Sequence, residues 1–340
     1  RAIVRHEPVG TALCITPYNY PLSTTALQVA PALAAGNAVI LKPASKTPIS
    51  AAILAEIIVD AADDLPEGAF GFVPGRASEI GDVLAGDDRI DAIAMTGSSG
   101  AGKHVAGVSG MVELHMELGG NAPAIVFPDA DLEAASSAAA SGSLKYAGQR
   151  CSAVSRVLVH EDAHDELVDR IDAEMEGFEP GDLFDEETSL GPLISHEQAE
   201  WVEELVEDAL DRGATLVRGG SRSGRFVEPT LLADVPQDAR IVHEEQFGPV
   251  VAVTSFPDES AALSIANGGE LGLDAAVFTS DYDRAMRVAD RLEAGGVRIN
   301  GAPSHGLGDI PFGGVKDSGI GREGLGYTID AFVESKSIIL

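Results

Sequence analysis

The sequence predicts an α/β protein in which a parallel-sheet domain is followed by a second α/β domain. Up to about residue 119, short β-branched runs alternate with stretches of helical length, and a second series of this kind begins after Gly119-Gly120. Such alternation is typical of βαβ units, whose strands are parallel. The composition, 45% apolar residues with 38 glycines among 340, fits a core-forming protein with many turns.

The first domain, residues 1–119, shows the spacing of successive βαβ units that is typical of nucleotide-binding proteins. Cys14 lies in one of the apolar runs and is expected to be buried. Strands are expected at 11–16, 38–41, 70–73 and 91–95, and helices at 23–35, 48–62, 78–85 and 99–108.

The second domain is expected at 120–319, with residues 320–340 as a C-terminal tail. The tail ends in the apolar run Ser337–Leu340, and an uncovered strand of that kind seeks another edge, most simply in a second subunit. Strands are expected at 124–127, 156–159, 215–217, 250–256 and 275–279, and helices at 131–144, 164–175 and 197–211.

The charge excludes some partners. Acidic residues number 54 against 23 basic ones, giving a net charge of −31, which repels nucleic acid and anionic membranes and suits a surface solvated in high salt.

Two cysteines cannot form a disulfide framework, so we expect a reducing, cytoplasmic setting. No apolar stretch approaches the roughly 20 residues of a membrane span. Because the chain opens at Arg1 in mid-pattern, we expect that the N-terminal part of the first domain is missing.

Cys151 and Glu117 are the candidate nucleophile and base. A thiol attacks as thiolate, and its ordinary pKa of about 8.5 must be lowered by a nearby cation or base. Arg150, the residue before Cys151, supplies a cation, and Glu117, which precedes Leu118-Gly119-Gly120, supplies a carboxylate. The alternative is that a lone cysteine among small residues packs as a small hydrophobe.

Two polar residues follow expected strands, where functional loops of parallel sheets lie. Asn19 either donates its amide to an oxyanion or is a turn asparagine before Tyr20-Pro21. Lys42 is either an ordinary surface lysine or a donor to a bound ribose.

Three motifs resemble known signatures but lack their context. Gly97–Lys103 has P-loop spacing, yet His104 stands where a P-loop needs Ser or Thr for magnesium, which favours phosphate binding at a helix start over hydrolysis. Gly319–Gly324 has the letters of a dinucleotide fingerprint but follows a polar segment, Lys316–Ser318, that is not expected to be a strand. His160–His164 spells a zinc motif, but His160 ends an apolar strand and Asp162 is expected to cap the next helix, so no metal site is predicted.

Taken together, the motifs are similar to those of the aldehyde dehydrogenase superfamily, from Arg5 to Leu340. They occur in the family's order and spacing, which makes the set highly specific. The segments are Pro17–Pro21, Leu41–Ala44, Met95–Ser98, Glu117–Asn121, Gly148–Cys151, Glu244–Val250 and Pro311–Gly314.

The resemblance implies a dinucleotide-binding domain, a catalytic domain, and oxidation of an aldehyde to a carboxylate with NAD or NADP. Cys151 would add to the aldehyde, the Asn19 amide and the Cys151 N–H would hold the oxyanion, and Glu117 would activate water to hydrolyse the thioester. The implied cofactor-binding residues are Lys42, Gly97, Ser98, Glu245 and Phe247, and Phe312 would line the substrate tunnel.

Two departures from the family pattern are visible. The chain lacks the family's opening segment, including much of the oligomerisation hairpin, although a homodimer or homotetramer is still implied. Ser45, with Lys46 beside it, replaces a glutamate that NAD-preferring relatives often carry, which predicts that NADP is accepted.

The substrate is predicted less closely. The Asn19-Tyr20 and Arg150-Cys151 pairs and the Ser304-His305-Gly306 loop look like the non-phosphorylating glyceraldehyde-3-phosphate and lactaldehyde dehydrogenase branches. Tyr20 and Arg150 would then bind a small hydroxylated or phosphorylated aldehyde. Two alternatives stay open: a CoA-acylating aldehyde dehydrogenase, which Glu117 disfavours, and a nucleotide-binding protein without catalysis.

Overall fold

The part of the chain that the computed structural model describes, residues 1–61, 65–304, 308 and 310–340, divides into two compact units. Unit 1 comprises Arg1–Leu118, His305–Gly313 and Asp317–Leu340, and unit 2 comprises Gly119–Ser304 and Gly314–Lys316. The first division lies next to the expected boundary at residue 119. The expected run of one domain to residue 319, with a separate tail, differs from the structure: the chain returns to unit 1 because β18 (Gly319–Ile320) pairs with β6 (Glu113–Glu117).

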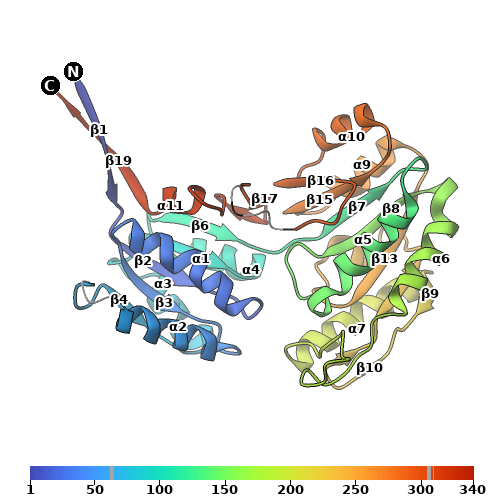
Figure 1. Ribbon diagram of the computed structural model, residues 1–340, viewed down its shortest axis with the longest axis horizontal. Coiled ribbons are helices and arrows are strands. Elements are labelled where there is room, and N and C mark those ends of the chain that lie inside the picture. Colours follow the sequence, from blue (N-terminus) through green and yellow to red (C-terminus); the bar gives the residue numbers. More distant parts are fainter. Residues whose placement is uncertain (62–64, 305–307, 309) are drawn as a thin grey trace. The chain divides into compact units, whose positions relative to one another are not determined.

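Unit 1 is built on a six-stranded sheet in the order β18-β6-β5-β2-β3-β4 (Figure 1). The four strands and four helices expected here are confirmed to within two residues at each end, whereas β6 was not predicted, although the polar–apolar alternation of its sequence, Glu-Leu-His-Met-Glu, is typical of a strand. Except for the antiparallel β18, the strands are parallel. Their bounds are β2 (Thr11–Ile15), β3 (Ala38–Lys42), β4 (Phe70–Phe72) and β5 (Ala92–Thr96), with helices α1 (Pro21–Ala34), α2 (Pro48–Ala61), α3 (Ala77–Ala85) and α4 (Ser99–Val108).

Alternation along the strands gives this sheet two buried faces. Cys14 on β2 packs in the cluster that includes Val29 of α1 and Ala51 of α2. Leu13, which directly precedes Cys14 on β2, belongs to a second cluster that includes Val105 of α4. Because side chains of a strand point alternately to opposite faces, helices on both sides of the sheet are held by one apolar run.

The chain ends form a separate two-stranded ribbon. β1 (Ala2–Pro8) pairs antiparallel with β19 (Val333–Ile339), which follows the short helix α11 (Tyr327–Asp330), and the N- and C-termini lie together at its tip (Figure 1). The Arg1 amino group donates to the Leu340 carbonyl at 3.2 Å. The expected terminal strand is therefore confirmed, and its partner within the chain is β1.

Unit 2 is built on a seven-stranded sheet in the order β16-β15-β7-β8-β13-β12-β9, parallel except for β9. Its strands are β7 (Ala122–Val126), β8 (Val154–His160), β9 (Thr215–Arg218), β12 (Thr230–Ala233), β13 (Val250–Phe256), β15 (Asp274–Phe278) and β16 (Gly296–Ile299). Its helices are α5 (Leu132–Leu144), α6 (His164–Met175), α7 (His196–Asp211), α8 (Arg240–His243), α9 (Glu259–Asn267) and α10 (Tyr282–Ala289). Two short pairs complete it, β10 (Arg222–Ser223) with β11 (Phe226–Val227), and β14 (Leu271–Gly272) with β17 (Val315–Lys316).

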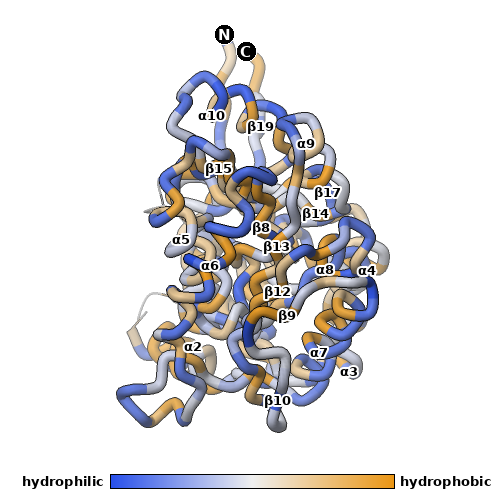
Figure 2. Tube along the Cα trace, turned by 90° about the vertical axis from the view of Figure 1, so that its right-hand side faces the viewer, coloured by the Kyte–Doolittle hydropathy of each residue, from blue (hydrophilic) through white to orange (hydrophobic). Residues whose placement is uncertain are grey.

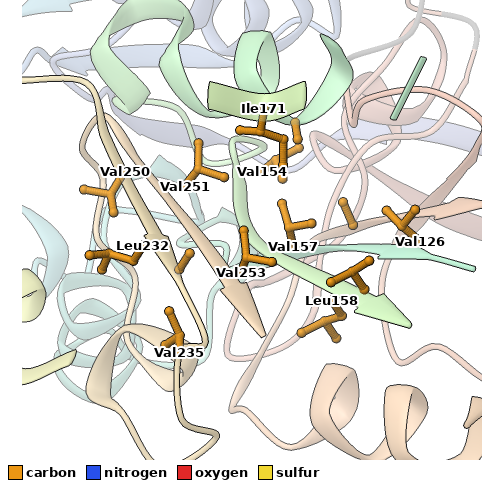
Figure 3. Close-up of a cluster of buried hydrophobic side chains, with 14 of the residues drawn as sticks. Val126, Val154, Val157, Leu158, Ile171, Leu232, Val235, Val250, Val251 and Val253 are labelled. Atoms are coloured by element: carbon orange, nitrogen blue, oxygen red, sulfur yellow. The ribbon is translucent and has the colours of Figure 1, made fainter. Parts of the chain in front are cut away.

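The core of unit 2 lies around its central strands, which carry the hydrophobic colouring in Figure 2. Val157 of β8 and Val253 of β13 are register partners and fully buried, and Ile171 of α6 approaches them from one face (Figure 3). Near-continuous Val and Leu runs of this kind are what a sheet covered on both faces requires. Within the described chain, no helix is both long and apolar enough to cross a bilayer.

Candidate active site

The predicted site residues of unit 1 gather at the carboxyl edge of its sheet. Lys42 and Glu117 end β3 and β6, Asn19 follows β2, and Gly97-Ser98 follows β5. The sheet register sets Ile15 beside Lys42 and Thr96 beside Glu117. Because β6, β5, β2 and β3 are neighbours, the loops after them meet at one edge, where parallel sheets commonly bind ligands.

Asn19 and Lys42 are both buried, which for Lys42 argues against an ordinary surface lysine and for Asn19 leaves the turn alternative open. Asn19 is 8% exposed and precedes Tyr20, whose left-handed backbone (φ 46°) begins α1. Lys42 is 4% exposed, and burial lowers the pKa of its ammonium group. Its one described hydrogen bond is a long one, 3.4 Å to the Pro43 carbonyl, so the ammonium keeps donors for a ligand. Ser45 is exposed.

The P-loop-like segment has structural roles that differ from those of a P-loop. Ser98 caps α4, its Oγ accepting from the Ala101 N–H at 3.3 Å. Gly102 packs closely against Leu118, because a Cβ there would lie 2.5 Å from Cδ1 of that side chain, which would then have to move. Lys103 forms an ion pair with Asp317. What remains for a phosphate is the set of N–H groups at the start of α4.

The predicted residues of unit 2 lie at the opposite end of their strands, the amino edge. Cys151 precedes β8, Gly120 precedes β7, and Glu245 and Phe247 precede β13. These three strands are neighbours in the order β7-β8-β13, so their entering loops lie side by side.

Gly120 connects the thiol loop to the Glu245 carboxylate. Its N–H donates to Glu245 Oε1 at 2.9 Å, and a Cβ at this position would overlap the carbonyl oxygen of Cys151. In the same way, a Cβ at Gly148 would overlap the carbonyl of Gly248. The loops that carry Cys151 and Glu245 therefore pack backbone against backbone, and glycine is needed at both contacts.

The two cysteines differ sharply. Cys14 is fully buried, and desolvation raises the pKa of its thiol to about 12, so it is inert at neutral pH. Cys151 is half-buried and follows Tyr146, Ala147 and Gly148, which all have left-handed backbone with φ of 62°, 54° and 70°. Consecutive residues in this region are unfavourable and concentrate at functional sites.

Glu245 is a partly exposed residue whose desolvated carboxyl group is unusually basic. Burial raises its carboxyl pKa to about 7, although the Gly120 N–H acts in the opposite direction. A desolvated carboxylate is stabilised when a ligand hydroxyl donates a hydrogen bond to it. Phe247, two residues on, has left-handed backbone with φ 48°.

Three substrate predictions have different surroundings. Arg150 is half-buried, and its Nη2 donates to the Gly142 carbonyl at 2.7 Å, at the C-terminal end of α5. Phe312, in unit 1, is buried and exchanges backbone hydrogen bonds with Glu323 at 2.9 and 2.6 Å. Of the Ser304-His305-Gly306 loop, His305 and Gly306 lie outside the described residues.

Sequence reasoning missed Arg156, which supports the start of β7. It is 3% exposed, and its guanidinium donates to Asn121, Val242, Ile265 and Ala266 carbonyls at 2.8–3.2 Å. Desolvation lowers its pKa to about 10. Its signal was present as a lone arginine inside the apolar run 154–159.

Two expectations about other motifs are corrected. Asp162 lies within a short 3₁₀ turn, Glu161–Ala163, and the residue before α6 is Ala163, so Asp162 does not cap that helix. Lys316, expected outside any strand, belongs to β17, which is too short to begin a βαβ unit. Among the described residues, no group of His, Cys, Asp or Glu has the geometry to hold a metal ion.

Fold and site define a two-unit α/β protein with a helix start at the carboxyl edge of one sheet and, in the other unit, a half-buried thiol in a loop packed beside the Glu245 carboxylate. The chain belongs to the aldehyde dehydrogenase family, whose model matches residues 1–338. It is an oxidoreductase of that family.

Named relatives agree with this assignment. The chain is 39% identical over 338 residues to NADP-dependent glyceraldehyde-3-phosphate dehydrogenase of Streptococcus equinus, covering 99% of this chain and 70% of the relative. It is 44% identical over 327 residues to NADP(+) succinate-semialdehyde dehydrogenase of Deinococcus radiodurans, covering 95% and 68%. The structure of glyceraldehyde-3-phosphate dehydrogenase from Methanocaldococcus jannaschii complexed with NADP matches with a TM-score of 0.96 at 39% identity, over 100% of this chain and 74% of that one.

Proposed function

We propose that this chain oxidises an aldehyde to a carboxylic acid with NAD or NADP, using Cys151 as nucleophile. The observation that carries the proposal is the packing around Gly120, which holds the half-buried cysteine loop against the Glu245 carboxylate. A reactive thiol and a carboxylate suited to a ribose hydroxyl are the two groups that this chemistry needs in the second unit.

The reaction begins at Cys151. Its thiolate Sγ forms a bond to the aldehyde carbon, and the oxyanion accepts hydrogen bonds from the Asn19 amide and the Cys151 N–H. When bound, NAD(P) supplies the hydride acceptor, which leaves a thioester on Cys151. Glu117 then takes a proton from water as the water oxygen adds to the thioester carbon, and the carbon–sulfur bond breaks to release the carboxylate and the thiolate.

The residues present fit the cofactor. Lys42 keeps donors for the adenine ribose, the start of α4 with Gly97 and Ser98 offers N–H groups to the pyrophosphate, and Glu245 would hold the nicotinamide ribose with Phe247 beside the ring. At the ribose, Ser45 leaves no carboxylate to repel a 2′-phosphate, so we propose that NADP is accepted and preferred. The ratio of kcat/KM for the two cofactors tests this, and a strong NAD preference would contradict it.

A small hydroxylated or phosphorylated aldehyde is the proposed substrate. Relatives named for glyceraldehyde-3-phosphate and lactaldehyde support this class, as do Tyr20, which is exposed, and Arg150, which keeps guanidinium donors besides the Nη2 bond to Gly142. A panel of lactaldehyde, glyceraldehyde-3-phosphate and an alkyl aldehyde of equal length, followed by NADPH formation, tests the class. Equal efficiency on the alkyl aldehyde would remove the proposed polar recognition.

Two variants separate the chemical roles. Cys151→Ala should abolish aldehyde oxidation, because no other accessible thiol exists in the chain. Glu117→Gln should slow deacylation, so that a covalent thioester accumulates and is seen by mass spectrometry of the intact protein. Unchanged turnover in Glu117→Gln would remove that residue from the mechanism.

The two alternative functions, a CoA-acylating enzyme and a nucleotide-binding protein without catalysis, predict different experimental results. A product that forms only with CoA would identify a CoA-acylating enzyme, which Glu117 disfavours. Cofactor binding without alkylation of Cys151 by iodoacetamide would favour a nucleotide-binding protein without catalysis.

We also propose that the β1–β19 ribbon pairs with a second copy of the chain in a homodimer or homotetramer. A two-stranded ribbon is marginally stable alone, and Ile339 and Leu340 at its tip are 84% and 77% exposed. Ile339→Asp should shift the assembly to smaller species in sedimentation velocity, whereas Ser335→Asp, at another exposed ribbon position, should not. A monomeric wild-type protein would contradict this proposal.

A further inference from the structure

The loop between α8 and β13 has a backbone that requires an external support. It carries Glu245 and Phe247, the proposed nicotinamide-side residues, yet it has no regular structure from Glu244 to Pro249. Phe247 has a left-handed backbone, φ 48°, which a residue with a Cβ adopts unfavourably. Such a conformation persists only where neighbouring groups hold it.

Gln198 of α7 supplies that support. Its Nε2 donates to the carbonyl of Gln246 at 3.0 Å and to the carbonyl of Phe247 at 3.3 Å. These two carbonyls lie on either side of the φ and ψ torsions of Phe247. One nitrogen fixed between them therefore restrains both torsions at once.

Trp201, one helical turn after Gln198, binds the loop residue that precedes Gln246. Trp201 Nε1 donates to the Glu245 carbonyl at 3.0 Å, so side chains at i and i+3 of α7 hold three successive carbonyls. Arg240 lies over the Trp201 ring at 5.0 Å and pairs with Glu244. The loop is thus attached from Glu244 to Phe247.

Helix α7 is a rigid base for these contacts. Ser195 caps it, and Ala199, Val202 and Leu205 are fully buried. Val202 also packs against Gly248, where a Cβ would overlap its side chain. The position of Gln198 is therefore set by the core of unit 2.

We propose that Gln198 is a positioning residue for cofactor binding, which fixes the left-handed backbone of Phe247 and thereby the directions of the Phe247 ring and the Glu245 carboxylate. This inference rests on the proposed role of those two residues. Gln198 acts through the loop, and the proposal assigns it no contact with the reacting atoms.

The test compares the whole cofactor with its adenine half. Gln198→Met keeps the length of the side chain but removes the donor, and it should weaken NADPH binding by about tenfold, the size expected for losing a hydrogen-bond pair. Binding of adenosine 2′,5′-bisphosphate, which lacks the nicotinamide half, should be unchanged and shows that the variant is folded. Emission from Trp201, the one tryptophan of the chain, should change in the free protein because its acceptor moves. Glu207→Gln, exposed on the same helix, is the matched control.

A double-variant cycle isolates the backbone role. Glycine adopts left-handed backbone freely, so in a Phe247→Gly background Gln198→Met should change NADPH affinity by less than about twofold. An undiminished loss in that background, or unchanged NADPH affinity and Trp201 emission in Gln198→Met alone, would overturn the proposal. If instead Phe247→Gly and Glu245→Gln alone leave NADPH affinity unchanged, the assigned cofactor role of the loop fails. Gln198→Ala repeats the comparison if the Met variant does not fold.

Discussion

At the residue scale, glycines and buried charges define what the site can do. Gly120 lies against both the Cys151 carbonyl and the Glu245 carboxylate, so the loops that carry these two residues meet at Gly120. Any side chain at this position would separate them. Gly120 is therefore a geometric requirement of the fold, and it lies next to the boundary between the units.

Gly120→Ala should be destabilising and should disturb Cys151. The added Cβ meets backbone on one side and Leu273 on the other, so the clash cannot be relieved by a rotamer change, and we expect a loss of about 1–3 kcal/mol in the free energy of unfolding. Iodoacetamide alkylation of Cys151 should change in rate as well. Gly110→Ala, where a Cβ meets nothing within 4 Å, is the control and should alter neither measurement.

Cofactor affinity should depend on the ionisation of Glu245. Its pKa is raised to about 7 by burial, so the carboxylate that we propose accepts from a ribose hydroxyl forms only as the pH rises through about 7. The dissociation constant for NADH should therefore fall between pH 6 and pH 8. NADH is the suitable probe because the 2′-phosphate of NADPH itself titrates near pH 6. Glu245→Gln should lose the pH dependence, and an equal slope in that variant would refute the assignment.

At the element scale, α4 shows how packing accounts for part of a sequence pattern that resembles a ligand-binding motif. Gly102 faces Leu118, whereas Gly107 on the same helix is exposed with nothing near its Cβ position. The glycine spacing that resembles a P-loop thus has at least one purely steric cause.

Gly102 and Gly107 of α4 should respond oppositely to alanine. Gly102→Ala should lower the free energy of unfolding by about 1–3 kcal/mol through overpacking. Gly107→Ala should raise it by about 0.5–1 kcal/mol, because alanine loses less backbone entropy in a helix. Urea unfolding of both variants decides the matter, and a stabilised Gly102→Ala would show that Leu118 gives way.

At the scale of the whole molecule, the charge of −31 sets the conditions for stability. Repulsion among surface carboxylates opposes the compact state and weakens as salt screens it. We expect the melting temperature to rise between about 0.1 and 1 M KCl, where the Debye length shortens from about 10 to 3 Å. Sucrose, which favours compact states without screening charge, is the comparison, and a melting temperature insensitive to KCl would argue against a surface built for high salt.

Much of the fold was predictable from local patterns. Apolar runs such as 250–256 and helices such as 99–108 and 164–175 were recovered with their bounds, because their periodicity is local. Strand β6, which carries Glu117, was missed because its polar–apolar alternation is short and includes only two apolar residues, Leu114 and Met116. The ordered motifs predicted the family, which the match over residues 1–338 confirms. The individual roles of Asn19, Lys42 and the other site residues remain predictions.

The sequence by itself determined the alternation of strands and helices, the family, and the candidate nucleophile, since each depends on neighbours along the chain or on ordered motifs. Only the tertiary structure decided that the chain returns to unit 1 after residue 304, that β1 and β19 pair, and that Gln198 and Arg156 bind the backbone of distant loops. These features rest on hydrogen bonds between segments far apart in sequence. Their donors and acceptors exist in every peptide group, so no local pattern specifies which of them meet.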